Sequence, residues 1–232
     1  MRIWVTRAAP EADATARRLR ALGHAPLLAP VLAVRPVEGP GPDLEGVGAI
    51  AFTSRNGVRA FAGLCGERGL PCFAVGGATA RAAKDLGFTT VHASAGDALA
   101  LAAFIAGRRT SFEGHVLHAA PELPAADLIG ALTELGVRAR SHVVYRTEPL
   151  ALAPAALVAL EADPVELDGV LVHSPQAARR LAEFAALDLA APELVSFCIS
   201  PAAAEPLKRL NFKTILTSPF PNELSLLNLI QA

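Results

Sequence analysis

Several residue types that would point to a specialised class of protein are scarce in this chain. The three cysteines (Cys65, Cys72 and Cys198) have no CxxC or Cys/His spacing, which argues against a disulfide framework and a zinc site. Neither sign of charge is in excess, since 21 Lys and Arg residues accompany 22 Asp and Glu residues. A general nucleic-acid-binding protein normally has a basic surplus. Apolar runs are interrupted by Gly, Pro or Arg before about 18 residues, so no membrane span is predicted.

Common ligand-binding motifs are also missing. Gly76-Gly77 is not part of a GxGxxG fingerprint, and neither a Walker motif nor a GxSxG elbow occurs. His115 and His118 are three residues apart in a predicted strand, which places them on opposite faces, so no metal site is expected. The first seven residues lack the long apolar segment of a signal peptide, and we expect a cytoplasmic protein.

Hydrophobic residues make up 52% of the 232 residues, enough to form one large or two small cores. Patterns typical of strands alternate with patterns typical of helices along the chain. This order predicts parallel sheets with helices on both faces, the α/β class. Strands are expected at residues 3–6, 25–29, 49–52, 72–75 and 90–92, and helices at 11–22, 56–65, 78–86 and 98–106.

An internal repeat divides the sequence into two similar halves. Residues 2–30 resemble residues 115–142, because each segment has a strand pattern, then Ala-Ala-Pro-Glu, then a helix ending in Leu-Gly. Residues 49–60 likewise match 169–180, with Ser54 aligned to Ser174. The match continues in residues 73–88 with 197–212 and in 97–105 with 222–230. The chain is therefore predicted to form two similar α/β domains.

Two Pro-rich or extended segments, residues 31–42 and 145–154, are suited to connect the domains. If both segments cross between domains, the first strand–helix–strand segment packs with the second half of the chain and one domain is discontinuous. Otherwise the two domains follow one another. The sequence allows both arrangements.

Several predicted strands end in a small or hydroxyl residue directly before a helix. In a parallel sheet these turns meet at the carboxyl edge, where helix N-termini attract anions. Each Ser or Thr could alternatively do no more than cap its helix. Five such turns around one interdomain cleft would form an anion site: Thr6-Arg7, Thr53-Ser54, Gly76-Gly77-Ala78-Thr79, Ser174-Pro175 and Ser200-Pro201.

Two further side chains could take part in chemistry. Arg7 follows the first strand, where its guanidinium could bind a carboxylate or make only a surface ion pair. Tyr145 is the only tyrosine and lies in the predicted connector. Its phenol could donate a proton to a leaving group, or its ring could be buried at an interface with the hydroxyl exposed to water.

At these residues the sequence resembles the uroporphyrinogen-III synthase family over essentially its whole length. The resemblance rests on the order and spacing of short motifs: Val5-Thr6-Arg7, Phe52-Thr53-Ser54-Arg55-Asn56-Gly57-Val58, Ala74-Val75-Gly76-Gly77-Ala78-Thr79-Ala80, Gly96-Asp97-Ala98, Val144-Tyr145-Arg146-Thr147 and His173-Ser174-Pro175. It implies a bilobed fold of two similar parallel-sheet α/β domains with an interdomain cleft and a two-stranded connector. The implied domains are residues 1–34 plus 149–232 and residues 37–144, with connectors near 35–36 and 145–148.

The resemblance also implies a lyase of haem biosynthesis that needs no cofactor or metal. Such an enzyme cyclises hydroxymethylbilane to uroporphyrinogen III, with loss of water and inversion of the last ring. Tyr145 is then the catalytic residue, and we expect a monomer without nucleic-acid or membrane partners. The residues expected to bind the substrate are Arg7, Thr53, Ser54, Gly77, Thr79, Ser174 and Ser200.

The chain departs from the family's Gly-Pro-x-Thr motif in both halves. The first copy, Gly76-Gly77-Ala78-Thr79, lacks the proline, and the second, Ser200-Pro201-Ala202-Ala203, lacks the glycine and the threonine. A catalytically silent binding or regulatory protein on the same fold is therefore the alternative. A periplasmic-type solute-binding protein is a third interpretation, which the missing export signal disfavours.

Overall fold

The computed structural model describes residues 1–231, which form two compact units. Unit 1 consists of Met1–Ala33 together with the chain from Glu148 onward, and unit 2 is Val34–Thr147. The chain thus has the discontinuous arrangement, in which its first segment packs with its last.

Unit 1 contains a parallel sheet in the order β11-β10-β9-β1-β2. The N-terminal strand lies inside this sheet, with Ile3 opposite Pro26 of β2 on one side and Gly169 of β9 on the other. The strands are β1 (Arg2–Val5), β2 (Ala25–Leu28), β9 (Gly169–Val172), β10 (Val195–Cys198) and β11 (Thr214–Thr217). The helices are α1 (Glu11–Ala21), α6 (Pro154–Glu161), α7 (Pro175–Leu181), α8 (Ala185–Ala190), α9 (Pro201–Ala204) and α10 (Glu223–Asn228), with 3₁₀ turns at Ala191–Glu193 and Glu205–Leu207.

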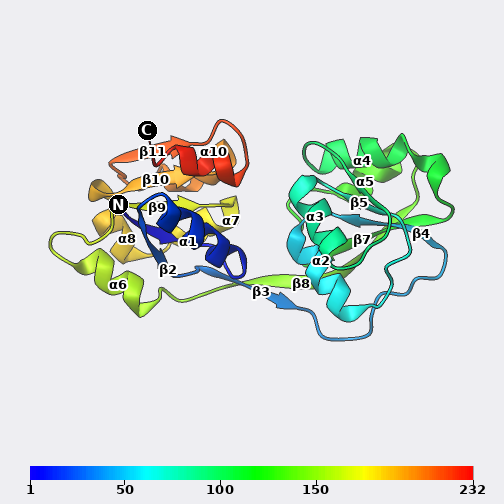
Figure 1. The fold of residues 1–232 in the computed structure, drawn as a ribbon, viewed down its shortest axis with the longest axis horizontal. Coiled ribbons are helices and arrows are strands. Elements are labelled where there is room, and N and C mark those ends of the chain that lie inside the picture. The colour runs from blue at the N-terminus through cyan, green and yellow to red at the C-terminus, as the bar shows by residue number, and fades with distance from the viewer. Residues whose placement is uncertain (232) are drawn as a thin grey trace. The chain divides into compact units, whose positions relative to one another are not determined.

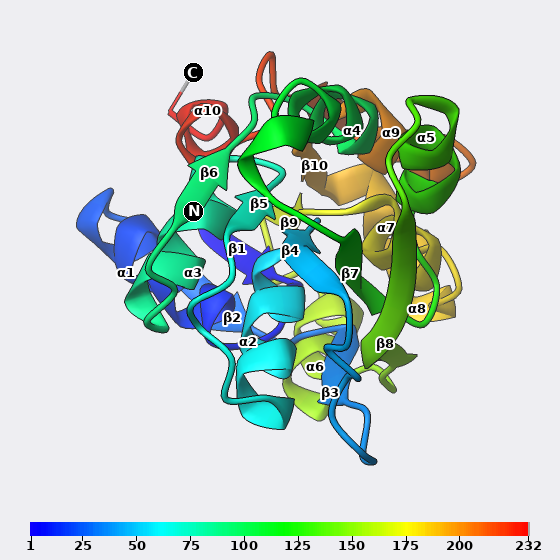
Figure 2. The same cartoon turned by 90° about the vertical axis from the view of Figure 1, so that its right-hand side faces the viewer.

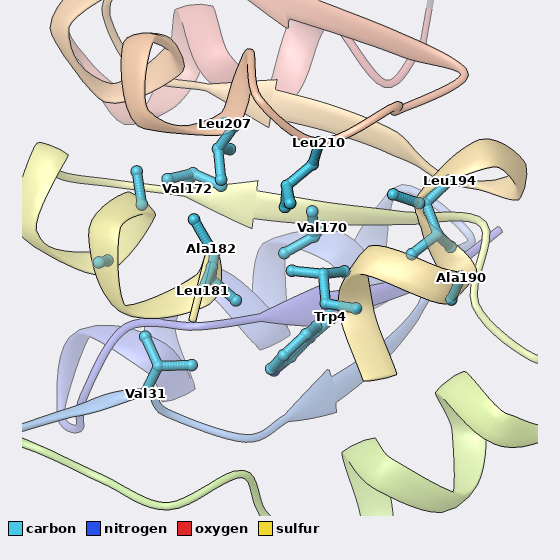
Figure 3. Close-up of a cluster of buried hydrophobic side chains, with 14 of the residues drawn as sticks. Trp4, Val31, Val170, Val172, Leu181, Ala182, Ala190, Leu194, Leu207 and Leu210 are labelled. Atoms are coloured by element: carbon cyan, nitrogen blue, oxygen red, sulfur yellow. The ribbon is translucent and has the colours of Figure 1, made fainter. Parts of the chain in front are cut away.

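Successive residues of β1 point to opposite faces of this sheet, and helices bury both faces. Ile3 and Val5 pack with residues of α1 and α10, whereas Trp4 packs with residues of α6, α7, α8 and α9. Figure 3 shows Trp4 among the apolar side chains of this second cluster. The indole Nε1 of Trp4 donates a hydrogen bond to the Ala29 carbonyl oxygen at 2.7 Å, which satisfies its one buried polar atom.

Unit 2 contains a sheet in the order β3-β8-β7-β4-β5-β6, whose strands from β8 to β6 are parallel neighbours. The additional strand β3 pairs with β8, and both cross the boundary between the units along the chain. The strands are β3 (Leu32–Pro36), β4 (Val47–Phe52), β5 (Cys72–Ala74), β6 (Val91–Ala93), β7 (His115–Pro121) and β8 (Ala139–Pro149). The helices are α2 (Arg55–Leu64), α3 (Gly77–Asp85), α4 (Ala98–Ala106) and α5 (Leu128–Glu134), with a 3₁₀ turn at Arg109–Ser111.

Helices also cover both faces of the unit 2 sheet. Figure 1 shows α2 and α3 on one side of its strands and α4 and α5 on the other. The buried clusters agree with this, since Phe52 packs with residues of α2 and α3, while Phe73 packs with residues of α4 and α5. The predicted class, two similar α/β domains with parallel sheets, is confirmed.

The internal repeat of the sequence is also a repeat of the structure. Strands β9, β10, β11, β1 and β2 of unit 1 occupy the same order as β4, β5, β6, β7 and β8 of unit 2. Each copy of the repeat therefore contributes strands to both units. The predicted elements agree with the observed ones within one or two residues, and the α4 bounds are those predicted. Within residues 1–231, the helices are too short or too polar to cross a lipid bilayer.

Candidate functional site

A tyrosine–serine pair lies next to the carboxyl ends of β4 and β7 in unit 2. Tyr145 of β8 pairs with Pro121 at the end of β7, and its hydroxyl oxygen is 2.9 Å from Ser54 Oγ. Ser54 directly follows β4 and is the N-cap of α2, where its Oγ accepts a hydrogen bond from the Gly57 N–H at 2.9 Å. Figure 2 shows β4 and α2 next to one another, with β7 and β8 to the right of β4. The phenol is thus joined to the first turn of α2 through a single side chain.

Burial stabilises the neutral form of this phenol. Only 7% of Tyr145 is exposed, and the residue belongs to the buried cluster that also contains Val58 and Phe61. Burial raises the pKa of Tyr145 above its ordinary value, whereas the hydrogen bond with Ser54 acts in the opposite direction. A phenol is protonated at neutral pH even at its ordinary pKa, so the Tyr145 hydroxyl can donate its hydrogen to a ligand.

Gly57 allows the helix to approach this tyrosine. A Cβ at this position would lie 2.9 Å from the Ala119 carbonyl oxygen of β7 and 3.8 Å from Cε1 of Tyr145. A side chain would therefore push the first turn of α2 away from the strand. Gly57 belongs to one of the sequence motifs. Its role could not be predicted, because the sequence does not show which strand lies next to it.

A second pair links the same turn to the neighbouring strand β7. Thr53 Oγ1 lies 3.1 Å from Nε2 of His118, a residue that is only 2% exposed. Burial lowers the pKa of His118 to about 4, so the imidazole is neutral at neutral pH. Nothing in the sequence predicts this polar partner for His118. Its contact with Thr53 depends on β4 and β7 being neighbours, which no local pattern reveals.

The N-terminus of α3 follows the adjacent strand β5 and has no side-chain cap. Gly76 is the N-cap and Gly77 the first helical residue, and a Cβ on either would meet no atom within 4 Å. The backbone N–H groups of this turn are accordingly available to an anion. Thr79 is the third residue of the helix and therefore not its N-cap. Its side chain is buried.

Ser174 and Ser200 in unit 1 each cap a helix, the second of the two roles that the sequence allowed them. Ser174 Oγ accepts the Ala177 N–H of α7 at 3.1 Å, and Ser200 Oγ accepts the Ala203 N–H of α9 at 3.3 Å. Both oxygens serve as acceptors in these bonds. The hydroxyl hydrogens remain able to donate to an anionic ligand.

Arg7 lies in a partly buried ion-pair cluster of unit 1. Its Nη1 is 2.6 Å from Oε2 of Glu223, the first residue of α10. The same carboxylate accepts a hydrogen bond from Thr15 at 2.5 Å and lies 3.2 Å from Nε2 of His173. Burial alone would raise the pKa of Glu223, but His173, Thr15 and Arg7 together lower it to about 2. Glu223 was not predicted from the sequence, in which it is 216 residues from Arg7.

The structure therefore brings the predicted residues together in two sets. Thr53, Ser54, Gly77 and Thr79 lie at or next to the carboxyl ends of β4 and β5 in unit 2, and Tyr145 lies within β8 opposite the carboxyl end of β7. Arg7, Ser174 and Ser200 follow β1, β9 and β10 in unit 1. That both sets serve a single cleft stays a prediction. Among residues 1–231, the structure has no group of three or more His, Cys, Asp or Glu side chains arranged to hold a metal ion.

Comparisons with known proteins agree on one family. The family profile described as uroporphyrinogen-III synthase HemD matches residues 13–228. The solved uroporphyrinogen-III synthetase of Helicobacter pylori is 16% identical, with a TM-score of 0.64 over 99% of this chain and 97% of that chain. A mutant uroporphyrinogen-III synthase of Thermus thermophilus is 21% identical, with a TM-score of 0.58 over 100% and 97%. These two matches show the fold. No curated protein sequence matches this chain significantly.

Proposed function

The chain belongs to the uroporphyrinogen-III synthase family, and from this membership we propose that it acts as a lyase that cyclises hydroxymethylbilane. In the proposed reaction, water leaves the first ring and the macrocycle closes with the last ring inverted, without a cofactor. The observation that supports this function most directly is a buried, protonated phenol beside a helix N-terminus at the carboxyl edge of a parallel sheet.

Tyr145 is the proposed acid for departure of the hydroxyl group. The carbon–oxygen bond of the hydroxymethyl group breaks, with its electron pair remaining on oxygen. The phenol proton of Tyr145 completes the water molecule, and the pyrrole becomes an electrophilic azafulvenium ion. The last pyrrole attacks this ion through a substituted carbon, and fragmentation of the resulting spiro intermediate allows ring closure in the inverted orientation.

The substrate has carboxylates on every pyrrole, and we assign their recognition to open backbone and hydroxyl donors. The uncapped N-terminus of α3 at Gly77 provides backbone N–H groups, and Thr53, Thr79, Ser174 and Ser200 are the candidate hydroxyl donors. Arg7 already pairs with Glu223, but a guanidinium has five N–H donors and can bind a second carboxylate.

Holding the substrate in one conformation is the main catalytic task in this proposal. A linear tetrapyrrole closes a ring readily without help, so the enzyme must favour the inverted closure over the direct one. Contacts to many carboxylates would restrict the flexible chain before the chemical step. Such restriction lowers the barrier by positioning rather than by new chemistry.

The direct test is an assay with freshly generated hydroxymethylbilane. We expect uroporphyrinogen III as the product. Exclusive formation of the type I isomer would reject the synthase function and support the silent binding protein instead. The Tyr145→Phe variant should keep its circular dichroism spectrum but lose about a hundredfold in kcat, the usual contribution of a general acid. An unchanged kcat would remove the role assigned to Tyr145.

We further propose that the chain works as a cytoplasmic monomer without nucleic acid. Three free thiols fit a reducing compartment, and the balanced charge gives no electrostatic attraction to nucleic acid. Light scattering of the purified protein at several concentrations tests the monomer, because a mass that rises with concentration would contradict it.

A further inference from the structure

Three groups, the Gly57 N–H, Ser54 and Tyr145, form a chain of hydrogen bonds. The direction of each bond is fixed if the phenol donates its hydrogen to a substrate. The Gly57 N–H donates to Ser54 Oγ at 2.9 Å, and Ser54 Oγ lies 2.9 Å from the Tyr145 hydroxyl. When Tyr145 directs its own hydrogen toward a substrate, its oxygen can only accept the hydrogen of Ser54. The order is then Gly57 N–H to Ser54, Ser54 O–H to Tyr145, and Tyr145 O–H to the leaving group.

We propose that Ser54 is a positioning residue that connects the positive end of α2 to the phenol of Tyr145. This goes beyond the substrate-carboxylate contact that the sequence motif predicts for Ser54, and it rests on the proposed function of Tyr145. Helix α2 has ten residues, and the aligned peptide dipoles place partial positive charge at its first N–H groups. The O–H bond of Ser54 is polarised toward Tyr145, because Ser54 Oγ accepts a hydrogen bond from one of these N–H groups while its hydroxyl donates one to the phenol.

The contribution of Ser54 increases as the proton leaves the tyrosine. Cleavage of the carbon–oxygen bond takes the phenol proton into water and leaves a phenolate opposite the azafulvenium ion. The bond from Ser54 then becomes a hydrogen bond to a charged acceptor, which is stronger than the bond to the neutral phenol. The attacking ring later loses a proton as the macrocycle closes, and this proton restores the phenol. The step consumes no other reactant.

The matching position in unit 1 shows what distinguishes this serine. Ser174 caps α7 in the same way, with a bond of 3.1 Å from the Ala177 N–H. It has no phenol to act on, because Tyr145 is the only tyrosine in the chain. The absence of a side chain at Gly57 also brings the first turn of α2 close to the tyrosine ring. Ser54 therefore has a second hydrogen-bond partner, the Tyr145 hydroxyl, which its role as the cap of α2 does not require.

Kinetics of paired variants test this role. Ser54→Ala should lower kcat about tenfold to a hundredfold with little change in KM, because the lost bond stabilises the phenolate in the transition state. Ser54→Thr retains a hydroxyl and should recover most of kcat. In a Tyr145→Phe background, Ser54→Ala should cause no further loss, since its effect passes through the phenol. An equal loss in both backgrounds, or a rise in KM alone, would overturn the proposal.

The single tyrosine gives a second, spectroscopic readout. Ultraviolet titration of the phenol should show a higher pKa for Tyr145 in Ser54→Ala than in the natural chain and in Ser54→Thr. Asp127→Ala is the matched control, because it removes the cap of α5 in the same unit, a bond of 2.8 Å from Gly130 N–H. This control should leave the titration and kcat unchanged. A titration unmoved by Ser54→Ala would contradict the link.

These outcomes separate the two proposals. If Tyr145→Phe retains full kcat, the proposed function of the tyrosine fails. If Tyr145→Phe is slow but Ser54→Ala acts equally with and without the phenol, only the role of Ser54 fails.

Discussion

At the scale of residues, burial and polar partners shift the pKa values of three buried or partly buried groups. Burial favours the neutral forms of Tyr145 and His118, since it raises the pKa of the phenol and lowers that of the imidazole. Glu223 is kept ionised, because the hydrogen bonds and charges of His173, Thr15 and Arg7 outweigh its burial. The two neutral groups lie in the unit that contains the proposed acid. A neutral His118 can hold the Thr53 hydroxyl without adding a charge near the phenol.

His118 should make the stability of the protein depend on pH. Its pKa falls from 6.5 to about 4 on folding, so the unfolded state binds the proton more strongly. Stability is complete above pH 6.5 and decreases as the pH falls toward 4, by about 3 kcal/mol over that window. His118→Gln can still bond Thr53 but does not titrate. Urea denaturation should therefore show a smaller loss of stability for this variant over the same window. Equal losses for variant and natural chain would contradict the assignment.

At the scale of elements, most helices begin with a side-chain cap, whereas α1, α3, α6 and α8 have none. Ser54, Ser174, Ser200, Asp97 and Asn222 each accept an N–H from the first turn of the helix that they cap. Helix α3 instead begins at Gly76-Gly77, where neither backbone strain nor crowding requires glycine. The missing side chains leave the first turn of α3 accessible to a ligand.

Gly77→Ala should separate stability from binding. Alanine favours the helix over glycine by up to about 1 kcal/mol, and its Cβ meets no atom within 4 Å, so the free energy of unfolding should be unchanged or higher. The added methyl would obstruct a carboxylate approaching the N–H groups, and we expect KM for hydroxymethylbilane to rise severalfold. Gly63→Ala in α2 is the control, because it has the same open surroundings away from the site. If KM is the same in both variants, α3 does not bind the substrate.

At the scale of the whole molecule, the chain forms one continuous and one discontinuous unit. Strand β1 lies between β9 and β2, and Trp4 fills the core on one face of that sheet. The first 33 residues are therefore an integral part of unit 1. Unit 2 has its own two buried clusters and consists of consecutive residues.

Fragments should reveal this difference. Residues 34–147, expressed alone, should fold and unfold cooperatively in urea, because about 110 residues with two covered sheet faces form a domain-sized core. The chain from residue 148 onward should remain unfolded alone, since it lacks the internal strand β1, and should gain structure when residues 1–33 are added as a peptide. Circular dichroism measures both. A folded C-terminal fragment without the peptide would contradict this account.

The resemblance to the synthase family, first inferred from short motifs, is confirmed by the match over residues 13–228. Several residues of the candidate site could also be named from the sequence. Tyr145 and Ser54 were both candidates because one is the only tyrosine and the other joins a strand pattern to a helix pattern. Their contact could not be predicted, since they are 91 residues apart and meet only when β8 and β4 lie on either side of β7.

The amino-acid sequence by itself determined the alternation of strands and helices, the capping residues and the duplication, because each depends on residues only a few positions apart or on direct similarity. The residue patterns left the arrangement of the two halves open, and the family resemblance implied the discontinuous one that the structure has. Tertiary structure alone decided which polar groups pair. Thr53 with His118, Ser54 with Tyr145 and Arg7 with Glu223 are separated by 65, 91 and 216 residues. Such pairs depend on strand order and close packing, and these physical constraints act between segments that no local pattern relates.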